Sequence, residues 1–214
     1  DTNPWAMLVD DIRLMSSPEA FATPEQHREL LKAWILFTFF KELAATRPLL
    51  LCLGAPGSGK TTTMRRIVRV LDDWSSDVLE LATDKQDSLR SSLINNHILV
   101  LDNLEQTTAR WLVDTLNRAA TGGSVELRQL YTTSDTIRMK LDCFVAMTAV
   151  SLPFSEETLY SRVLVLEFEP LVAPIPEHKL QADLMASYIP IWQGMLQALN
   201  SVVKSINSHH LEEA

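Results

Sequence analysis

The sequence predicts an α/β fold in which helices cover a parallel sheet. Two short, continuous apolar runs, at 48–53 and 98–101, are typical of buried parallel strands. A glycine-rich segment directly follows the first run, and a helical segment follows the glycines. Further strand-like runs at 143–150 and 163–168 are separated from these by helical patterns. This alternation favours a sheet with helices on its faces.

Length and composition limit the class of protein. The 214 residues, 46% hydrophobic and 21% charged, suit one soluble α/β core. No apolar run approaches the ~18 residues of a membrane span, so no membrane association is expected. The net charge of −8 argues against a broad nucleic-acid-binding face, but it permits a small basic element within an assembly. Cys52 and Cys143 each lie in an apolar run, which indicates a reduced core and a cytoplasmic location.

The glycine-rich segment is the strongest motif. Residues 54–61 read Gly-Ala-Pro-Gly-Ser-Gly-Lys-Thr and fill every fixed position of the phosphate-loop pattern G-x-x-x-x-G-K-[ST]. Three of the six glycines fall here because the backbone N–H groups must turn inward around a diphosphate without obstruction by side chains. The predicted nucleotide-binding residues are Gly54, Ala55, Pro56, Gly57, Ser58, Gly59, Lys60, Thr61 and Thr62.

The residues around this loop predict ATP and Mg²⁺ as cofactors. Lys60 is placed to reach the β and γ phosphates, and the Thr61 hydroxyl would ligate Mg²⁺. The helix predicted over 60–72 points its positive N-terminal end at the phosphates. The strand at 98–101 ends in Asp102, the usual place for the carboxylate that holds Mg²⁺ through water.

The group that activates the attacking water has two candidates. A glutamate often follows the Mg²⁺ carboxylate, but Asn103 stands there and cannot accept a proton. Glu105 is the alternative base, although it equally suits the N-terminal turn of the helix predicted over 108–120. A strand at 78–81 and a helix at 86–93 fill the interval before Asp102.

The second half of the chain adds a hairpin and two strands. Gly122 and Gly123 end the helix, and two alternating segments then flank Thr132 to Asp135, which predicts a β-hairpin. The strand at 143–150 carries Thr148 near its end, and Arg162 directly precedes the strand at 163–168.

These segments resemble AAA+ ATPases, and within them the superfamily-three helicases and phage or plasmid primase-associated helicases. The resemblance implies a P-loop NTPase three-layer sandwich with parallel sheet order 5-1-4-3-2, a β-hairpin insertion and flanking helices. It further implies ATP hydrolysis, a homo-oligomeric ring such as a hexamer, and single-stranded DNA at the hairpin. The matching stretches, within 48–171, are "GAPGSGKTT", "ILVLDN", "ATGGSVELRQLYTT", "FVAMTAVSLPF" and "LYSRVLVLEFEPL".

The resemblance also implies roles for two residues. Thr148 would sense the γ-phosphate, where asparagine is more usual; the alternative is a β-favouring threonine satisfied within the sheet. Arg162 would act on the ATP of the neighbouring subunit; the alternative is an ion pair with Glu156 or Glu157. The hairpin tip has no lysine or arginine, and the basic residues on its arms are Arg128, Arg138 and Lys140.

The flanking segments complete a division into three parts. Residues 25–46 are apolar nearly all round, which predicts a helix buried under the core or in a subunit contact. Residues 177–206 read as helical with a break at Pro190 and could pack as a lid over the nucleotide. We therefore expect an N-terminal helical segment at 1–47, a P-loop ATPase core at 48–171 and a C-terminal helical lid at 172–214. The chain starts with Asp1, so we expect a longer full protein.

The function predicted from these features is that of an ATPase. The first hypothesis is a Mg-ATP-hydrolysing AAA+ motor of a mobile-element DNA replication helicase. The alternative is a non-motor AAA+ switch that assembles or regulates a protein partner. A small-molecule kinase ranks last because it needs an arginine-rich mobile lid, and the region after Thr148 offers Arg162 without an arginine cluster.

Overall fold

A five-stranded sheet with strand order β2-β3-β6-β1-β7 forms the centre of the protein. The computed structural model describes residues 4–17, 19–80, 86–104, 110–128, 136–154, 157–173 and 175–212. All four strand pairings are parallel. Counted among the sheet strands alone, the order from β7 is 5-1-4-3-2, as predicted; the labels differ because the hairpin takes β4 and β5. The strands are β1 (Leu49–Gly54), β2 (Leu79–Glu80), β3 (Ile98–Asp102), β6 (Phe144–Ala149) and β7 (Val163–Phe168).

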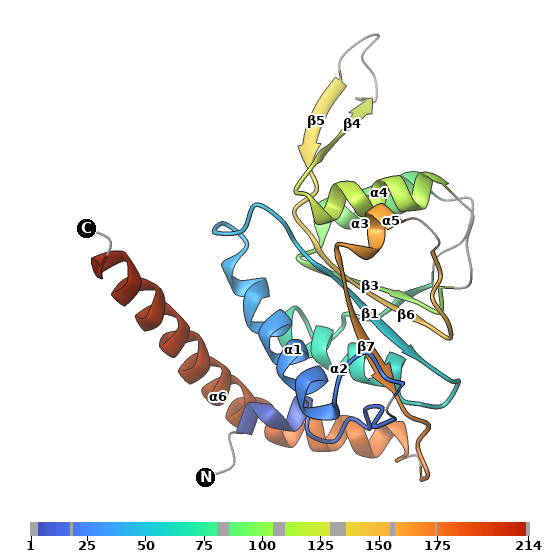
Figure 1. Ribbon diagram of the computed structural model, residues 1–214, viewed down its shortest axis with the longest axis vertical. Helices are drawn as coiled ribbons and strands as arrows, with labels where there is room; N and C mark the ends of the chain where they lie inside the picture. The colour runs from blue at the N-terminus through green and yellow to red at the C-terminus, as the bar shows by residue number, and fades with distance from the viewer. Residues whose placement is uncertain are drawn as a thin grey trace.

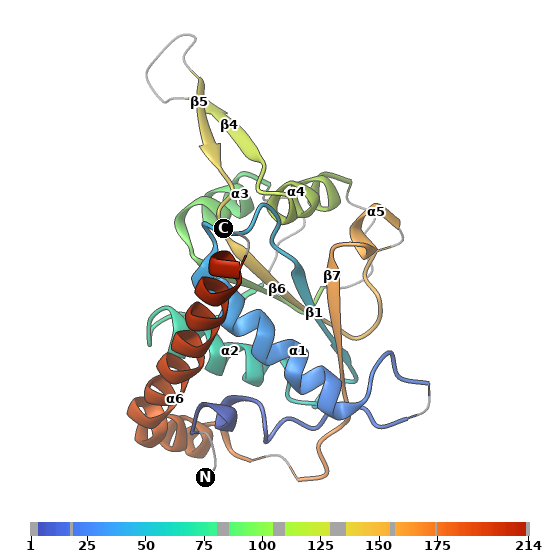
Figure 2. The ribbon, with the colours of Figure 1, turned by 60° about the vertical axis from the view of Figure 1, so that its left-hand side comes forward.

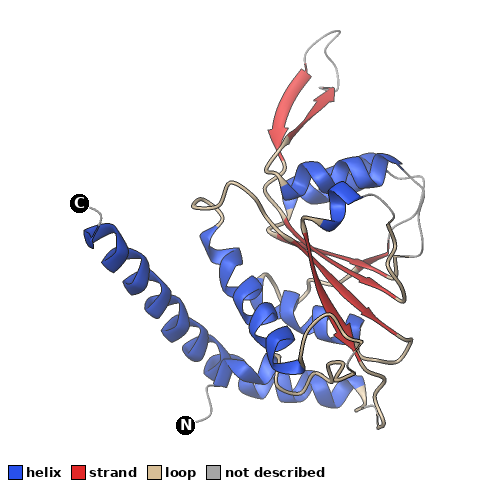
Figure 3. Cartoon of the chain, in the orientation of Figure 1, coloured by secondary structure: helices blue, strands red, loops and turns tan. Residues whose placement is uncertain are grey.

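Helices cover both faces of the sheet, which gives three layers (Figure 3). Side chains alternate along β1, so Leu50 and Cys52 enter one apolar cluster while Leu49 and Leu51 enter the other. The first cluster lies under α1 (Pro24–Phe37) and α2 (Lys60–Leu71). The second lies under α3 (Gln86–Asn95), α4 (Arg110–Ala120) and the short α5 (Glu157–Tyr160).

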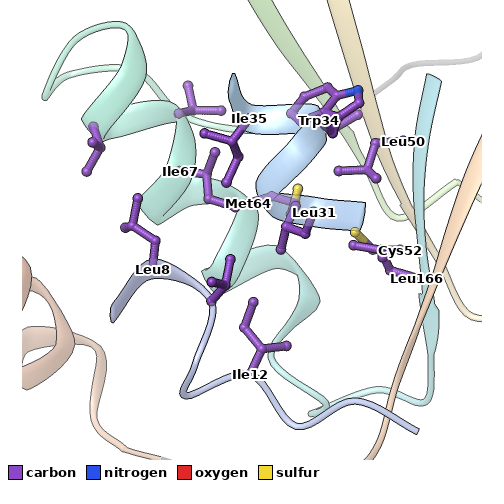
Figure 4. Close-up of a cluster of buried hydrophobic side chains, with 14 of the residues drawn as sticks. Leu8, Ile12, Leu31, Trp34, Ile35, Leu50, Cys52, Met64, Ile67 and Leu166 are labelled. Atoms are coloured by element: carbon purple, nitrogen blue, oxygen red, sulfur yellow. The ribbon is translucent and has the colours of Figure 1, made fainter. Parts of the chain in front are cut away.

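The cluster under α1 fixes the start of β1 (Figure 4). Thr23 caps α1 with a reciprocal capping box, in which Gln26 is the partner. Trp34 is buried in the cluster, and its indole Nε1 donates to the Pro48 carbonyl at 3.0 Å. This contact positions the residue that precedes β1, and therefore the strand that carries the phosphate loop.

The N-terminal part differs from the helix predicted over 25–46. Helix α1 ends at Phe37, and the 3-10 helix η2 (Thr38–Phe40) follows it. Phe39 and Leu43 are 38% and 71% exposed, so the expectation of burial on most sides is wrong beyond α1. Beyond α1 the apolar residues are only partly covered: the Phe39 ring packs edge-to-face on Trp192 of α6, with the ring centroids 6.0 Å apart.

Residues before α1 also belong to the core, which the sequence did not reveal. The 3-10 helix η1 (Pro4–Leu8) begins a stretch that buries five apolar residues. Leu14 forms an antiparallel bridge with Phe168, at the edge of the sheet. The buried residues are Trp5, Leu8, Val9, Ile12 and Leu14.

Helix α6 (Glu177–Glu212) contains Pro190 without ending there, so the predicted break is wrong. Figures 1 and 2 show that the helix changes direction along its length, as expected where proline removes a backbone N–H. Leu184, Ile191 and Met195 bury the helix against the first apolar cluster. The later turns leave the body of the protein (Figure 1). Within the described ranges, no helix combines the length and the apolar character needed to cross a membrane.

The predicted hairpin is present and projects from one end of the molecule (Figures 1 and 2). Strands β4 (Ser124–Arg128) and β5 (Thr136–Lys140) pair antiparallel. The predicted tip, residues 132–135, lies outside the described residues. At the base, the Leu141 amide donates to the Gly123 carbonyl at 2.8 Å. The buried Arg47 forms an ion pair with Asp142 there.

Candidate nucleotide-binding site

The phosphate loop connects β1 to α2 at the carboxyl edge of the sheet. Gly57 and Gly59 have φ values of +76° and +86°, which are left-handed conformations that favour glycine. A Cβ on Gly54 would lie 2.6 Å from the Phe168 carbonyl oxygen, so a side chain is excluded there. Gly59 is the N-cap of α2 and supplies no side-chain cap. The first N–H groups of the helix are therefore available to an anion.

Lys60 is held inside the loop. Its ammonium Nζ donates to the carbonyl oxygens of Gly54 at 2.6 Å and Ala55 at 3.0 Å, and to the Ser58 hydroxyl at 3.2 Å. The side chain is largely buried, and this burial lowers the pKa of Lys60, while Cys52 and Asp102 act in the opposite direction. The lysine therefore already lies where a phosphate would be cradled, held by neutral loop groups that a phosphate can replace.

A hydrogen-bond network joins three elements next to this loop. Thr61, in the first turn of α2, donates to Asp102 Oδ1 at 2.8 Å. Thr148, on β6, donates to the same oxygen at 2.6 Å. The Thr148 hydroxyl also accepts the Asn103 backbone N–H at 2.9 Å. Three predicted site residues thus meet at one carboxylate oxygen, and the Thr148 hydroxyl is satisfied by the site rather than by the strand ladder.

Asn103 and Glu105 differ in what the structure describes. Asn103 has a φ of +54°, a left-handed conformation that asparagine tolerates better than most residues. This conformation follows the end of β3 and aims the backbone N–H of Asn103 at Thr148. Glu105 lies outside the described residues.

The predicted Mg²⁺ ligands are one carboxylate and one hydroxyl. Among the described residues, no group of three or more His, Cys, Asp or Glu side chains could hold a metal. Mg²⁺ typically keeps several waters and is bound through one or two carboxylates together with substrate phosphates. The pair of Thr61 and Asp102 fits that mode of binding better than an all-protein cage.

A cavity of about 350 Å³ adjoins the phosphate loop. The loop and α2 contribute one wall, which includes Gly57, Gly59 and Thr62. The other walls come from Asp11, Ile12 and Arg13, near one end of the chain, and from Leu171, Ala173, Ile175 and Leu180, near the other. The contribution of residues 11–13 was missed from the sequence. The signal available was the alternation of Ile12 and Leu14 with charged neighbours, which is typical of an edge strand.

Arg162 lies at the amino edge of the sheet, where the parallel strands begin. β7 and β1 run parallel, with Leu49 opposite Val163 and Gly54 opposite Phe168. Arg162 directly precedes this ladder, so the whole length of β1, roughly 20 Å at ~3.3 Å per residue, separates it from the phosphate loop. Its Nη1 donates to Asn117 Oδ1 at 2.6 Å and to the Thr158 carbonyl at 2.7 Å. The structure does not bring Arg162 to the loop of its own chain.

Both cysteines lie in the core, as predicted. Cys52 and Cys143 are free and buried. Burial raises the pKa of the Cys52 thiol to about 12, and burial also raises the pKa of Cys143. Each thiol is therefore neutral and serves as a small apolar side chain.

The chain matches the family model of the actinomycete integrative conjugative element replication protein over residues 12–212. It belongs to this family. The match includes the phosphate loop, the hairpin and most of α6. No curated protein has a significantly similar sequence.

Solved structures with a similar fold include a helicase and the C-terminal region of NrS-1. JCV helicase is 18% identical with a TM-score of 0.50, and the match covers 98% of this chain and 67% of that chain. The apo NrS-1 C-terminal region is 16% identical with a TM-score of 0.57, over 81% of this chain and 41% of that chain. A second apo structure of that region is 13% identical with a TM-score of 0.57, over 88% and 44%.

These likenesses confirm the fold class, which the chain shares with JCV helicase and with the NrS-1 C-terminal region. At such identities they concern the fold alone. This member of the replication-protein family spans 41% and 44% of the two NrS-1 chains, so it corresponds to part of each.

Proposed function

We propose that this replication protein is a Mg-ATP-dependent AAA+ ATPase and the motor of a DNA replication helicase of an integrative conjugative element. The observation that carries the proposal is the contact between Thr61 and Asp102, 2.8 Å apart beside a glycine-lined loop that contains Lys60. This arrangement combines a phosphate cradle with a hydroxyl and a carboxylate in the positions that suit Mg²⁺.

The chain has a place for each part of the nucleotide. The loop residues 54–59 and the uncapped start of α2 would hold the phosphates, and Lys60 would leave its carbonyl partners for them. The cavity lined by residues 11–13 and 171–180 would take the nucleobase and sugar, with residues 172–214 acting as the lid. Mg²⁺, held by Thr61 and Asp102, would neutralise charge on the terminal phosphates.

The attacking water needs a residue that orients it or accepts its proton. Asn103 and Glu105 both follow Asp102, and only Glu105 can accept a proton. Thr148 shares a carboxylate oxygen with Thr61, so a change at the terminal phosphate would reach β6 through Asp102. This supports the γ-phosphate sensor role for Thr148.

Arg162 completes the site from a neighbouring subunit in this proposal. Its position, one strand length from its own loop, supports a role on the nucleotide of another copy of the chain. A ring such as a hexamer would repeat this pairing at every interface. The proposed partners are therefore ATP, further copies of the chain and single-stranded DNA, in the cytoplasm.

The test is ATP hydrolysis, measured as phosphate release. Lys60→Ala should reduce turnover at least about a hundredfold because a charge on the terminal phosphates is lost. Asp102→Asn should bind a fluorescent ATP analogue yet lose turnover by about tenfold or more. Lys32→Ala is the control because Lys32 forms an ion pair with Glu29 on the surface of α1. Normal hydrolysis by either site variant would contradict the proposal.

Single-stranded DNA separates the motor from the alternative, a switch that assembles or regulates a protein partner. A motor should hydrolyse ATP several-fold faster when an oligothymidylate is added, because translocation couples the two ligands. An ATPase whose rate is the same with and without the oligonucleotide would instead be the switch.

The two candidates for water activation give opposite results. If Glu105 is the base, Glu105→Gln should bind ATP normally and hydrolyse it at least about a hundredfold more slowly, while Asn103→Ala has a milder effect. Single-turnover hydrolysis measures both. If Asn103→Ala is the slower enzyme, Asn103 orients the water and Glu105 belongs to the following helix.

A further inference from the structure

The cavity beside the phosphate loop, here called the loop cavity, adjoins a second cavity. The second cavity has a volume of about 510 Å³. Four residues line both cavities and form a shared wall: Asp11, Arg66, Ile175 and Leu180. Further from the loop, apolar side chains and two carboxylates line the second cavity: Met7, Leu184, Ile191, Asp10 and Asp183. Of these carboxylates, only Asp11 also lines the loop cavity.

Helix α2 determines the order in which the parts of a nucleotide would meet these walls. Gly59 caps the helix where the phosphates would bind, and Thr62 lies in the first turn. Arg66 follows Thr62 by four residues, which is ~6 Å along the helix axis. In a nucleotide the sugar stands between the phosphates and the base. The shared wall at Arg66 and Asp11 therefore suits the sugar, and the apolar side chains beyond it suit the base.

Asp11 has one carboxylate oxygen to offer a ligand. Its Oδ2 accepts from Arg66 Nη1 at 2.7 Å, and the side chain is 46% exposed. Its Oδ1 makes no hydrogen bond or ion pair with the residues that the structure describes. An ionised carboxylate accepts hydrogen bonds and cannot donate them, so Oδ1 suits a donor such as a hydroxyl group.

Arg66 holds this carboxylate in place and offsets its charge. The guanidinium is 15% exposed, and its Nη2 donates to the Met7 carbonyl at 3.1 Å. This bond ties α2 to η1, which also packs on α6 (Figure 2). A carboxylate alone would repel the phosphates of a nucleotide, whereas one paired with Arg66 still accepts a hydrogen bond with little net charge. The Nε of Arg66 is buried without a partner in the described part of the chain, which indicates a missing acceptor.

We propose that Asp11 selects ribonucleotides by accepting a hydrogen bond from the 2′-hydroxyl of the sugar, and that Arg66 positions it. The 2′ carbon is bonded to the carbon that carries the base, and Asp11 lies where the two cavities meet. The 2′-hydroxyl is therefore the sugar hydroxyl expected at this wall. The inference rests on the proposed function, and it narrows the substrate to ribonucleoside triphosphates. A motor with this preference leaves deoxyribonucleotides for DNA synthesis.

Calorimetric titration with ADP and 2′-deoxy-ADP in the presence of Mg²⁺ tests Asp11 without hydrolysis. Wild type should bind ADP about tenfold more tightly, because the deoxy sugar loses a hydrogen bond to a charged group. Asp11→Ala should bind both nucleotides within about twofold of each other, through a loss of affinity for ADP. Asp11→Asn should give an intermediate ratio because the amide oxygen still accepts.

The chain offers a matched control in a second half-exposed aspartate that is paired with an arginine of α2. Asp77 is 51% exposed and accepts from Arg65 Nε at 2.6 Å, and it lines neither cavity. Asp77→Ala should keep the wild-type ratio of the two affinities.

Arg66 is tested by the same ratio. Arg66→Gln should reduce the preference for ADP to about threefold, because Asp11 loses the partner that orients it, and Arg66→Lys should recover part of it. A purely structural role would weaken both nucleotides equally and leave the ratio at its wild-type value, which would overturn the positioning role. Steady-state hydrolysis by wild type should show KM about tenfold higher for dATP than for ATP with kcat within about twofold, since the contact binds ground and transition states alike.

The outcomes separate this inference from the proposed function. If wild type hydrolyses ATP but binds ADP and 2′-deoxy-ADP equally, the role of Asp11 is overturned and the ATPase stands. If wild type prefers ADP and Asp11→Ala keeps that preference, another group reads the sugar, and the assignment to Asp11 is wrong. A wild-type chain that binds neither nucleotide overturns the proposed function, and this inference with it.

Discussion

The two edges of the central sheet present their charged groups in opposite ways. At the carboxyl edge, Lys60 is bound by loop oxygens, and Asp102 Oδ1 accepts from Thr61 and Thr148. At the amino edge, the Arg118 guanidinium makes no hydrogen bond or ion pair with the described residues, and the Nε of Arg90 is buried without a hydrogen-bond partner. The charged groups named at the carboxyl edge are hydrogen-bonded within the chain, whereas these two arginines at the amino edge have donors without partners.

This difference shows which edge depends on other molecules. A site whose polar groups already satisfy one another is preorganised for a ligand that replaces a few of those contacts. Guanidinium groups without partners gain most from a phosphate that another molecule brings. We therefore expect the carboxyl edge to bind the chain's own nucleotide and the amino edge to contact groups that another molecule supplies.

The largest expected effect tests whether Arg162 acts across a subunit interface. Arg162→Ala should lower ATP turnover about a thousandfold, since an arginine supplied in trans is worth ~10³ or more in rate. Mixing Arg162→Ala with Lys60→Ala should restore part of the activity, because some interfaces then pair an intact loop with an intact Arg162. Phosphate release from the mixture measures this.

Dilution is the companion measurement for Arg162. Wild-type activity per subunit should rise with protein concentration as assembly proceeds. Mixtures that stay inactive, together with concentration-independent wild-type activity, would mean that Arg162 acts within its own chain or only holds Asn117 and Thr158.

An intermediate effect is expected at the ion pair of Arg47 and Asp142, which anchors the base of the hairpin. Arg47 is 2% exposed, and Asp142 neutralises it. Asp142→Asn should lower the free energy of unfolding by about 2 to 3 kcal/mol because it leaves a buried guanidinium without its counter-charge. Urea denaturation measures the change. Asp87→Asn, which removes a 90% exposed carboxylate, should cost less than about 1 kcal/mol.

The pH dependence of the free energy of unfolding shows whether charge accounts for the difference between wild type and Asp142→Asn. Burial alone would raise the pKa of Asp142, but Arg47, Lys140 and Lys41 together hold it below its usual value. A carboxyl whose pKa is lowered by folding stabilises the protein above about pH 4, and this contribution is lost as the pH falls further. The gap between wild type and Asp142→Asn should therefore narrow in acid. A gap that is constant with pH would mean that packing, not charge, is responsible.

The smallest expected effect concerns the link between Thr148 and Asp102. Thr148→Val keeps the shape but removes both hydrogen bonds of the hydroxyl, so turnover should fall about tenfold while ATP affinity changes little. Thr148→Ser should retain most of the activity. Thr115→Val is the control because Thr115 is a buried threonine that donates to Trp111 within α4. Equal losses in Thr148→Val and Thr115→Val would reduce Thr148 to a packing role.

Prediction from the sequence succeeded where the conformation of a short segment is determined by its own residues. The phosphate loop is eight consecutive residues, and its glycines at 57 and 59 adopt the left-handed conformations that the loop requires. Strands β1 and β3 are short apolar runs, and Asp102 ends one of them because a charge is tolerated at the carboxyl edge. The sheet order, implied by the family resemblance, was confirmed with them.

Prediction from the sequence failed where contacts between segments far apart in the chain determine the structure. The early end of α1 and the continuation of α6 past Pro190 depend on which faces of each helix pack against other elements. The burial of Trp5 to Leu14 depends on β7 being an edge with a free row of backbone groups, which Leu14 then joins.

The sequence by itself determined that this protein has a phosphate loop, an acidic strand end and a parallel α/β core. Only the tertiary structure placed Thr148 on the carboxylate that Thr61 shares, and Arg162 at the opposite edge from the loop. It alone brought Arg90, Arg118 and Arg138 to one cavity. The physical reason is that a loop motif is specified by the local backbone conformation, whereas the meeting of side chains from separate elements depends on strand register and helix packing.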